Sequence, residues 1–524
     1  MFKILRTVLV IIVISPALLA ASAKGKRPNI LFIPIDDLKP VLGCYGNATV
    51  KTPNIDRLAS SGTVFLNNSC QQAICGPSRV SLLTGLYPDT TRIYSMEKFK
   101  KMRSVNPNLL TLPEYFKNKG YITTGYGKTF DSRNTDKKQD AQSWTIPHTS
   151  HPANSHYYQS KGLKYKDPVT AALFTKYFHL PRDKKAAFKN EHNCYPATEC
   201  TDFDLPDDAY IDGVQAKLAC AKLEKLAQKE KPFFLSVGFA KPHLPFIAPK
   251  KYWDLYKRDD FELATFQKLP KDSPYWSRHG NGELNGGYTG VPKTGLLKPL
   301  PEDYQRQLIQ GYYACTSYVD AQVGKLLDKV EELGIADNTI VVLWGDHGWH
   351  LGDHALWCKQ SNYEQAVRSP LIISSPWQRK KGVKSDSLTE FVDIFPTLCE
   401  LSNLPVPEVL EGKSLKNLLD NPKESVRNAA MSQYPRRLWQ DPKKPDSMGY
   451  TLRNKRYRYV KWVLMDYESG ARTGELIGTE LYDYQNDPLE TVNLAKDPSK
   501  ADVVDHFEKI FKTRGVAQES NTLR

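Results

Sequence analysis

Short, continuous apolar runs recur along the chain and predict buried β-strands. The clearest are residues 29–35, 232–238 and 339–344, and a shorter run lies at 121–124. Strands without a polar face are typical of a parallel sheet that helices cover on both sides. Residue 35 is followed directly by two aspartates, which indicates a polar site at the carboxyl end of that strand.

Helical periodicity is found between the apolar runs. It predicts helices at about 54–61, 112–119, 217–229 and 304–333, the last ending at Gly334. Because strands and helices alternate, we predict an α/β fold with a mainly parallel sheet between layers of helices.

The pattern changes in the last quarter of the chain. Beyond about residue 425 it becomes strand-like, and the chain then ends in a helix. We therefore predict a larger domain at 24–424 and a smaller α+β domain with an antiparallel sheet at 425–524. Segment 131–212 is polar, aromatic and poorly periodic, which predicts long surface excursions.

The first residues have the pattern of a secretory leader. Lys3 and Arg6 precede an apolar run at 8–20 and small residues at 21–23. We predict a signal peptide at 1–23 and an exported protein, periplasmic or secreted. The apolar run is short for a membrane span, and no later stretch has that length, so no membrane span is expected.

Charge and cysteine content narrow the class further. The chain has 72 Lys and Arg against 58 Asp and Glu, a formal charge of +14. Such a charge suits a polyanionic substrate, for example a sulfated or uronate-rich polysaccharide, and a generally basic surface explains it equally well. No nucleic-acid partner is expected. Cys194 and Cys200 flank a polar loop, and they could form a disulfide or remain a pair of inert thiols.

The segment from Cys75 to Arg79 has the pattern C-x-P-x-R. Pro77 suits the first position of a helix and Gly85 suits its end. Because residues four apart share a helix face, Arg79 is expected to point toward the sulfur at a helix N-terminus, where backbone N–H groups favour anions. The pattern predicts a nucleophile beside an anion-binding site, and a buried cysteine at an ordinary helix start is the alternative.

Two acidic pairs follow two of the predicted strands. Asp36 and Asp37 come after the first strand, and Asp346 and His347 come after the strand at 339–344. Parallel strands bring their carboxyl ends to one edge of the sheet. Three carboxylates and an imidazole there suit a hard cation such as Ca²⁺ or Mg²⁺ better than zinc.

Cationic and proton-donating residues lie at similar places. Lys128 follows a strand and a glycine-containing turn, His243 follows the strand at 232–238, and Lys359 lies shortly after Asp346. Each alone is typical of a solvated surface. Together they suit a centre that binds an oxyanion and protonates a departing oxygen.

These segments together resemble the type I, formylglycine-dependent sulfatases, and most of all the iduronate-2-sulfatase branch of that family. The resemblance spans about 28–404 and 480–494. The segments that carry it are 28–37, 75–79, 238–243, 345–349 and 359–362. It implies an alkaline-phosphatase-like α/β fold, catalysis in the domain at 24–424, and sulfuric ester hydrolysis.

The resemblance also implies roles for the residues. The implied ligands of one Ca²⁺ are Asp36, Asp37, Cys75, Asp346 and His347. Cys75 would be oxidised to formylglycine, the nucleophile, by a formylglycine-generating or equivalent maturation enzyme. Arg79 and Lys128 would steady that residue and the sulfate. His243 and Lys359 would contact the sulfate and help to protonate the leaving oxygen.

One position departs from the family pattern. The family has a histidine shortly after the lysine of Gly127-Lys128, where it acts on the formylglycine diol, and this chain has Asp131. Three roles are open: Asp131 acts as the base, His148 takes over, or Asp131 is a turn residue without a catalytic role.

The sequence therefore predicts an exported sulfatase that acts on a sulfated polysaccharide or its oligosaccharides, containing uronate or deoxysugar, such as a glycosaminoglycan or ulvan. The alternatives are a phosphonate or phosphate ester hydrolase of the same superfamily and a catalytically silent protein that binds sulfated glycans. Specificity is expected in the segments 131–212 and 270–300 and in the smaller domain.

Overall fold

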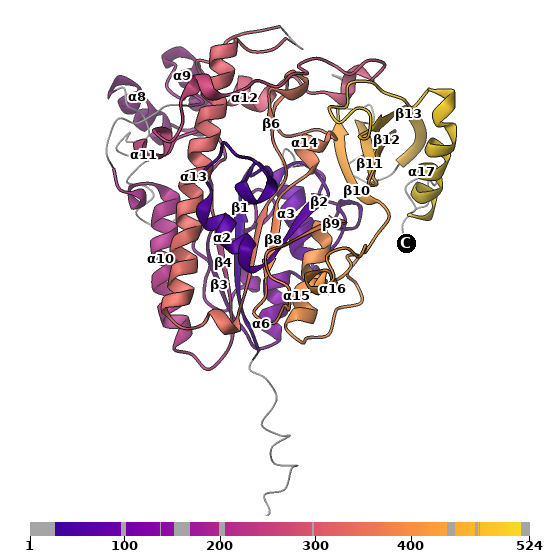
Figure 1. Cartoon of the computed structure of the whole chain (residues 1–524). Helices are drawn as coiled ribbons and strands as arrows, with labels where there is room; N and C mark the ends of the chain where they lie inside the picture. Colours follow the sequence, from indigo (N-terminus) through magenta and orange to yellow (C-terminus); the bar gives the residue numbers. More distant parts are fainter. Residues whose placement is uncertain are drawn as a thin grey trace, which may run out of the picture.

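The first predicted strand, β1 (Asn29–Ile35), lies within a seven-stranded sheet in the computed structural model (Figure 1). The strand order is β3–β4–β1–β5–β8–β2–β9. The other strands of this sheet are β2 (Thr63–Ser69), β3 (Ile122–Gly127), β4 (Phe233–Gly238), β5 (Thr339–Gly345), β8 (Leu371–Ser374) and β9 (Val383–Glu390). The structure describes residues 27–95, 101–136, 138–150, 168–198, 205–295, 298–437, 446–466, 470 and 472–514.

The sheet is mainly parallel, as predicted. Strand β1 is parallel to β4 and β5, β3 is parallel to β4, and β2 is parallel to β9. Strand β8 runs antiparallel to both of its neighbours. The sequence pattern predicted β1, β3, β4 and β5 but not β2, β8 and β9, because these three are short or rich in polar residues.

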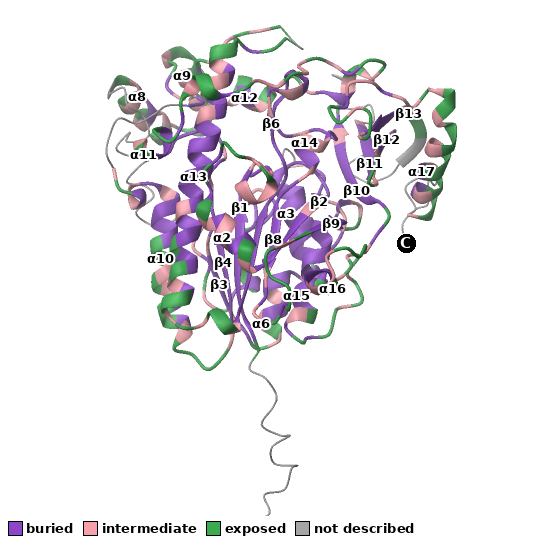
Figure 2. Ribbon diagram, viewed as in Figure 1, coloured by how far each residue is buried: buried purple, intermediate pink, exposed green. Residues whose placement is uncertain are grey.

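Successive residues of β1 enter two different cores. Ile30 and Phe32 belong to one core, and Leu31 and Ile33 belong to the other. Figure 2 shows the sheet buried between the helix layers. The helices of the first core are α3 (Cys75–Thr84), α5 (Met102–Val105), α6 (Leu112–Asn118), α14 (Glu364–Val367), α15 (Ile394–Leu401) and α16 (Lys416–Asp420). Those of the second are α2 (Pro53–Ser61), α8 (Pro168–His179), α10 (Ile211–Ala227), α11 (Lys250–Trp253), α12 (Gly282–Gly287) and α13 (Glu302–Glu332).

A second, antiparallel sheet is built from the end of the chain, again as predicted. Its strands, in order, are β10 (Ala430–Arg436), β11 (Asp446–Arg453), β12 (Tyr457–Met465) and β13 (Arg472–Asp483). The last helix, α17 (Ala501–Thr513), packs Phe507 and Phe511 against Tyr459, with ring centroids 5.7 and 6.0 Å apart. The boundary between residues 424 and 425 stays a prediction.

The segment 131–212 agrees in part with the predicted surface excursion, because α8 and α9 (Arg182–His192) lie at the surface whereas the part before them packs against the sheet. Besides two short 3₁₀ helices and the start of α10, its described part contains the α-helices α8 and α9, which the weak periodicity did not reveal. Asp131 and Trp144 are buried, and Thr149 forms a bridge with Tyr126 of β3. This part of the segment therefore extends the sheet edge instead of standing away from it.

Two predictions lie outside the described residues: the signal peptide at 1–23 and the state of Cys200. Within the described part of the chain, no helix is both long and apolar enough to cross a membrane. The described residues also form α4 (Pro88–Thr91), a two-stranded hairpin of β6 (His350–Leu351) and β7 (Trp357–Cys358), and several short 3₁₀ helices.

Candidate active site

The two acidic pairs meet at the carboxyl edge of the parallel strands. The N–H of Asp36 donates to the carbonyl of Phe239 at 3.1 Å, and that of Asp346 donates to the carbonyl of Ile35 at 3.2 Å. The N–H of Asp37 donates to Oδ1 of Asp346 at 2.9 Å. These bonds join the ends of β1, β4 and β5, so residues far apart in sequence share one buried site.

Four of the predicted ligands form one tight group. The possible ligand atoms of Asp37, Cys75, Asp346 and His347 all lie within 4.8 Å of one another. Nε2 of His347 lies 3.3 Å from Asp37 Oδ1 and 3.4 Å from both Asp346 Oδ1 and Cys75 Sγ. His347 Nδ1 lies 2.9 Å from the carbonyl of Gly348 and donates to it, which leaves Nε2 facing the carboxylates. This donor set fits a cation.

Asp36 lies beside this group and binds cationic side chains. Lys128 Nζ is 2.8 Å from both carboxylate oxygens, and Arg79 Nη2 is 3.1 Å from Oδ1. Burial alone would raise the pKa of Asp36, but the charges of Lys128 and Arg79 hold it well below its usual range. Asp36 also groups with Asp37 and His243 as possible ligand residues.

Arg79 is fully buried and bonds to carboxylates of the site. Its Nε donates to Asp346 Oδ2 at 2.9 Å, its Nη2 binds Asp36, and Nη1 donates to the carbonyl of Thr129 at 3.1 Å. The expectation that Arg79 points to the sulfur therefore missed its main partners. Helix α3 begins at Cys75, so Pro77 is its third residue and not its first, while Gly85 ends it with φ 68° as predicted.

The thiol of Cys75 is buried with no exposed surface. Burial raises its pKa well above the usual value, and the charge of Asp36 adds to this effect. The thiol is therefore protonated at neutral pH and is a poor nucleophile in this form. An unmodified Cys75 does not suit nucleophilic catalysis.

Lys359 and His243 reach the same group from two other loops. Lys359 Nζ is 3.0 Å from both oxygens of Asp37 and lies over the ring of Trp349. His243 Nδ1 donates to the carbonyl of Leu244 at 2.6 Å, and its Nε2 is 3.7 Å from Asp37 Oδ2. Burial lowers the pKa of His243 to about 4, so the ring is neutral at pH 7.

Asp131 lies at the edge of the site in a charge pair. Its carboxylate bonds to Arg133 at 2.6 and 2.8 Å and is 3.5 Å from Lys128 Nζ. Burial alone would raise its pKa, but Lys128 and Arg133 lower it. His148 is the alternative candidate for the base. Its Nε2 lies 3.0 Å from Oγ1 of Thr129, the residue after Lys128, and that hydroxyl is also 2.7 Å from Ser236 Oγ.

Two residues at the site were not predicted from the sequence. Glu283 Oε1 is 2.7 Å from Lys359 Nζ, and Asp212 accepts the N–H groups of Ala240 and Lys241 at 2.8 Å each. Glu283 lies in a polar, glycine-rich stretch and Asp212 begins a helix, so neither carries a local signal of function.

A further buried cluster supports the loop that carries Lys359. His350 Nδ1 bonds to Asp353, and its Nε2 is 2.7 Å from Ser361 Oγ. His354 stacks on the Tyr363 ring with centroids 4.2 Å apart. Hydrogen bonds within the fold account for these polar groups, which anchor the chain on both sides of Lys359.

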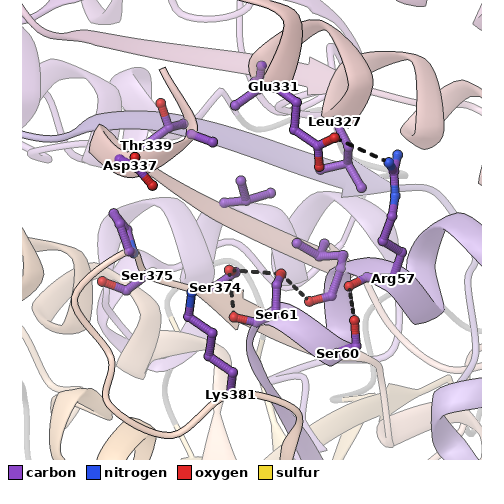
Figure 3. Close-up of a pocket in the computed structure, with 15 residues that line it drawn as sticks. Arg57, Ser60, Ser61, Leu327, Glu331, Asp337, Thr339, Ser374, Ser375 and Lys381 are labelled. Atoms are coloured by element: carbon purple, nitrogen blue, oxygen red, sulfur yellow. Dashed lines mark hydrogen bonds and ion pairs between the residues drawn. The ribbon is translucent and has the colours of Figure 1, made fainter. Parts of the chain in front are cut away.

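A pocket of about 220 Å³ lies at the opposite, amino edge of the sheet (Figure 3). Thr339, at the start of β5, and Ser374, at the end of the antiparallel β8, line it. Its polar groups bond to one another: Ser61 Oγ is 3.2 Å from Ser374 Oγ, and Arg57 pairs with Glu331 at 3.6 Å. None of the predicted catalytic or metal-binding residues lines this pocket.

Comparison with protein families agrees with the arrangement of the site. The family model described as Sulfatase matches residues 28–404, more than half of the chain. A second model, N-sulphoglucosamine sulphohydrolase, C-terminal, matches residues 352–515.

Individual proteins are similar over almost the whole chain. Iduronate 2-sulfatase of Mus musculus is 34% identical, over 90% of this chain and 91% of that protein. An ulvan-active sulfatase of Formosa agariphila is 29% identical, over 90% of this chain and 78% of that protein. Among solved structures, the phosphonate monoester hydrolase of Agrobacterium radiobacter has a TM-score of 0.70 at 22% identity, covering 94% of this chain and 96% of that chain. This last likeness concerns the fold.

Proposed function

The chain belongs to the sulfatase family and is a sulfuric ester hydrolase, and from that premise we propose that it desulfates a sulfated polysaccharide or its oligosaccharides. The observation that carries the proposal is the convergence of Cys75 with Asp37, Asp346 and His347 at the carboxyl edge of the sheet, beside Lys359.

Cys75 is the proposed precursor of a formylglycine. The C-x-P-x-R pattern and the raised pKa of the buried thiol support a nucleophile other than the thiol itself. A hydrated aldehyde at this position would supply a hydroxyl group that can attack sulfur. Because Cys75 has no exposed surface, the proposed maturation enzyme must reach it before this part of the chain folds.

The proposed metal is one Ca²⁺, held by Asp36, Asp37, Asp346, His347 and the modified residue 75. Carboxylate oxygens dominate this donor set, and such a set favours a hard cation. When bound, Ca²⁺ would neutralise charge as a Lewis acid. Removal of metal by a chelator should lower the melting temperature, and added Ca²⁺ should restore it. An unchanged melting temperature in both steps would contradict the assignment.

The chain's own residues provide the remaining proposed roles. Arg79 holds Asp36 and Asp346 in position through its guanidinium. Lys128, with a side chain 22% exposed, and Lys359, deeper in the site, supply positive charge for the sulfate oxygens. Nε2 of His243 faces the same space, and it would have to take up a proton there before it could donate to the sulfate or to the leaving oxygen.

The proposed substrate contains uronate or deoxysugar, as in a glycosaminoglycan or ulvan. The names of the relatives and the charge of +14 support this class. We also propose export, on the leader pattern of residues 1–23. A panel of sulfate, phosphate and phosphonate esters measures whether the protein also hydrolyses phosphorus esters.

The decisive test is release of inorganic sulfate from defined sulfated oligosaccharides by the wild type and by Cys75→Ala. We expect release by the wild type and none by the variant, because the variant has no formylglycine precursor. Asp208→Asn, at a partly exposed position outside the site, is the control and should act like the wild type. Equal activity of wild type and Cys75→Ala would overturn the mechanism.

A further inference from the structure

Glu283 of α12 lies at the entrance of the proposed active site. Its Oε1 is 2.7 Å from Lys359 Nζ and 3.6 Å from His243 Nε2, and its Oε2 is 3.4 Å from Gln360 Nε2. The side chains of Glu283 and His243 are 18% and 27% exposed, whereas that of Lys359 is 1% exposed. Glu283 and His243 thus form a solvent-facing rim above Lys359.

Contacts at both ends of α12 hold Glu283 in this position. At the start of the helix, Asn281 Oδ1 accepts the N–H of Trp357 at 2.9 Å, which ties α12 to the strand before Lys359. At the end of the helix, Lys189 of α9 donates to the carbonyl of Gly286 at 2.7 Å. Two segments that lie far apart in sequence therefore fix the position of α12, and with it the position of the Glu283 carboxylate at the rim.

The position of Glu283 changes the charge that an incoming anion meets. Lys359 already contacts both oxygens of Asp37 at 3.0 Å, so one ammonium faces two carboxylates. An anion that binds Lys359 must lie close to the Glu283 carboxylate, whose Oε1 is 2.7 Å from the same ammonium. Like charges repel, and each additional negative charge on the ligand increases the repulsion.

Sulfate esters and phosphate monoesters have the same tetrahedral shape but carry different negative charges. A sulfate ester is a monoanion, whereas a phosphate monoester carries about 1.5 to 2 negative charges at pH 7. We propose that Glu283 is a specificity-determining residue that makes the site favour monoanionic sulfate esters over dianionic phosphate monoesters. This inference rests on the proposed function, because it requires Lys359 to receive the anion.

Steady-state kinetics of Glu283→Gln test the inference with three aryl esters: para-nitrophenyl sulfate, para-nitrophenyl phosphate and the para-nitrophenyl monoester of phenylphosphonate. Relative to the sulfate ester, kcat/KM for the dianionic phosphate should rise at least about tenfold at pH 7.5 to 8. The phosphonate monoester is a monoanion, so its ratio to the sulfate ester should not change.

Two further variants make the result specific. Glu283→Asp keeps the charge and should keep the wild-type selectivity. Glu302→Gln removes an exposed carboxylate from the start of α13 and should change none of the ratios. A uniform loss of kcat for all three esters in Glu283→Gln would show that Glu283 only positions Lys359, and would overturn the inference.

Binding without turnover separates this inference from the proposed function. In the Cys75→Ala background, calorimetry with phenyl phosphate and phenyl sulfate should show the same shift of at least about tenfold when Glu283 becomes Gln. If the wild type desulfates glycans and the binding ratio stays constant, the inference fails and the function stands. If the ratio shifts and no glycan is desulfated, the function fails and the inference stands.

Discussion

The role of a charged residue in this site depends on the groups that it binds more than on its residue type. Arg79 is an arginine in an anion-binding pattern, yet its guanidinium binds Asp346 and Asp36 with no exposed surface of its own. Removing one partner of such a buried pair leaves a charge without compensation, at a cost of about 3–5 kcal/mol. We therefore propose that Arg79 influences the reaction by holding the carboxylates of Asp36 and Asp346 in place.

Asp131, where the family has a histidine, provides a prediction at the same scale. Its pKa is lowered by Lys128 and Arg133 even though burial would raise it, so the carboxylate is ionised at working pH and is a poor base. We expect Asp131→Asn to reduce kcat for sulfate release by less than about tenfold, whereas loss of a general base costs about 10²- to 10⁴-fold.

The measurement for Asp131 is kcat on a sulfated oligosaccharide over a range of pH, with Cys75→Ala as the inactive reference. Asp131→Asn should keep the shape of the wild-type pH profile. A loss of about a thousandfold, or the disappearance of one limb of the profile, would show that Asp131 is the base after all.

At the scale of secondary-structure elements, the site depends on bonds between loops that follow different strands. The start of α10 supplies Asp212, whose carboxylate accepts the N–H groups of Ala240 and Lys241 directly after β4. The same loop carries His243. One helix N-terminus thus sets the path of the loop that brings the imidazole into the site.

Asp212 predicts a pH dependence of stability. Burial raises its pKa from 3.8 to about 6 in the folded protein. Because the folded-state pKa is raised, the stabilising contribution is complete below about pH 4 and is lost as the pH rises through 6. From pH 4 to 7, this residue should lower the free energy of unfolding by up to about 3 kcal/mol.

Denaturant unfolding of the wild type and Asp212→Asn at pH 4, 5, 6 and 7 measures this contribution. The difference between the two proteins should change with pH in the stated direction, whatever their absolute stabilities. For Asp208→Asn, which neutralises a neighbouring, partly exposed carboxylate, the free energy of unfolding should change with pH as it does in the wild type. A pH-independent difference for Asp212→Asn would refute the prediction.

At the scale of the whole molecule, the antiparallel sheet holds a loop of the parallel sheet. Arg458 of β12 donates to the carbonyl of Asn362 at 2.7 Å and pairs with Glu490. Arg436 of β10 donates to the carbonyl of Gln360 at 2.5 Å. Both carbonyls lie within three residues of Lys359. The end of the chain therefore positions a cation of the proposed active site.

Arg458→Leu tests this dependence between the two sheets. The substitution leaves Glu490 buried without its partner, so we expect a loss of about 3–5 kcal/mol in the free energy of unfolding. It should also lower kcat for sulfate release, because the loop after Lys359 loses an anchor. Lys455→Leu removes an exposed lysine, paired with the exposed Asp386, from the turn before β12 and should cost at most about 1 kcal/mol.

Thermal or denaturant unfolding and kcat, measured on the same preparations of both variants, decide the outcome. A large loss of stability with wild-type kcat would show that Arg458 supports only the antiparallel sheet. It would contradict the proposed influence on Lys359.

The sequence by itself determined the parallel core, the antiparallel sheet at the end of the chain and the residues at the carboxyl strand ends. Local patterns suffice for these because apolar runs must be buried and a strand end brings polar residues to one edge. The sequence also predicted Cys75, Asp37, Asp346 and Lys359 as site residues, because each lies in a short segment that resembles the family.

Only the tertiary structure decided which partners these residues have. Glu283, Asp212 and Arg458 come from α12, α10 and β12, and each reaches the site across a distance in sequence that no local pattern can span. Their roles depend on the burial and the neighbouring charges that folding creates. A carboxylate interacts more strongly with a buried lysine such as Lys359 than with solvent on an exposed helix. Burial and neighbouring charges decide this strength, and both arise only when the chain folds.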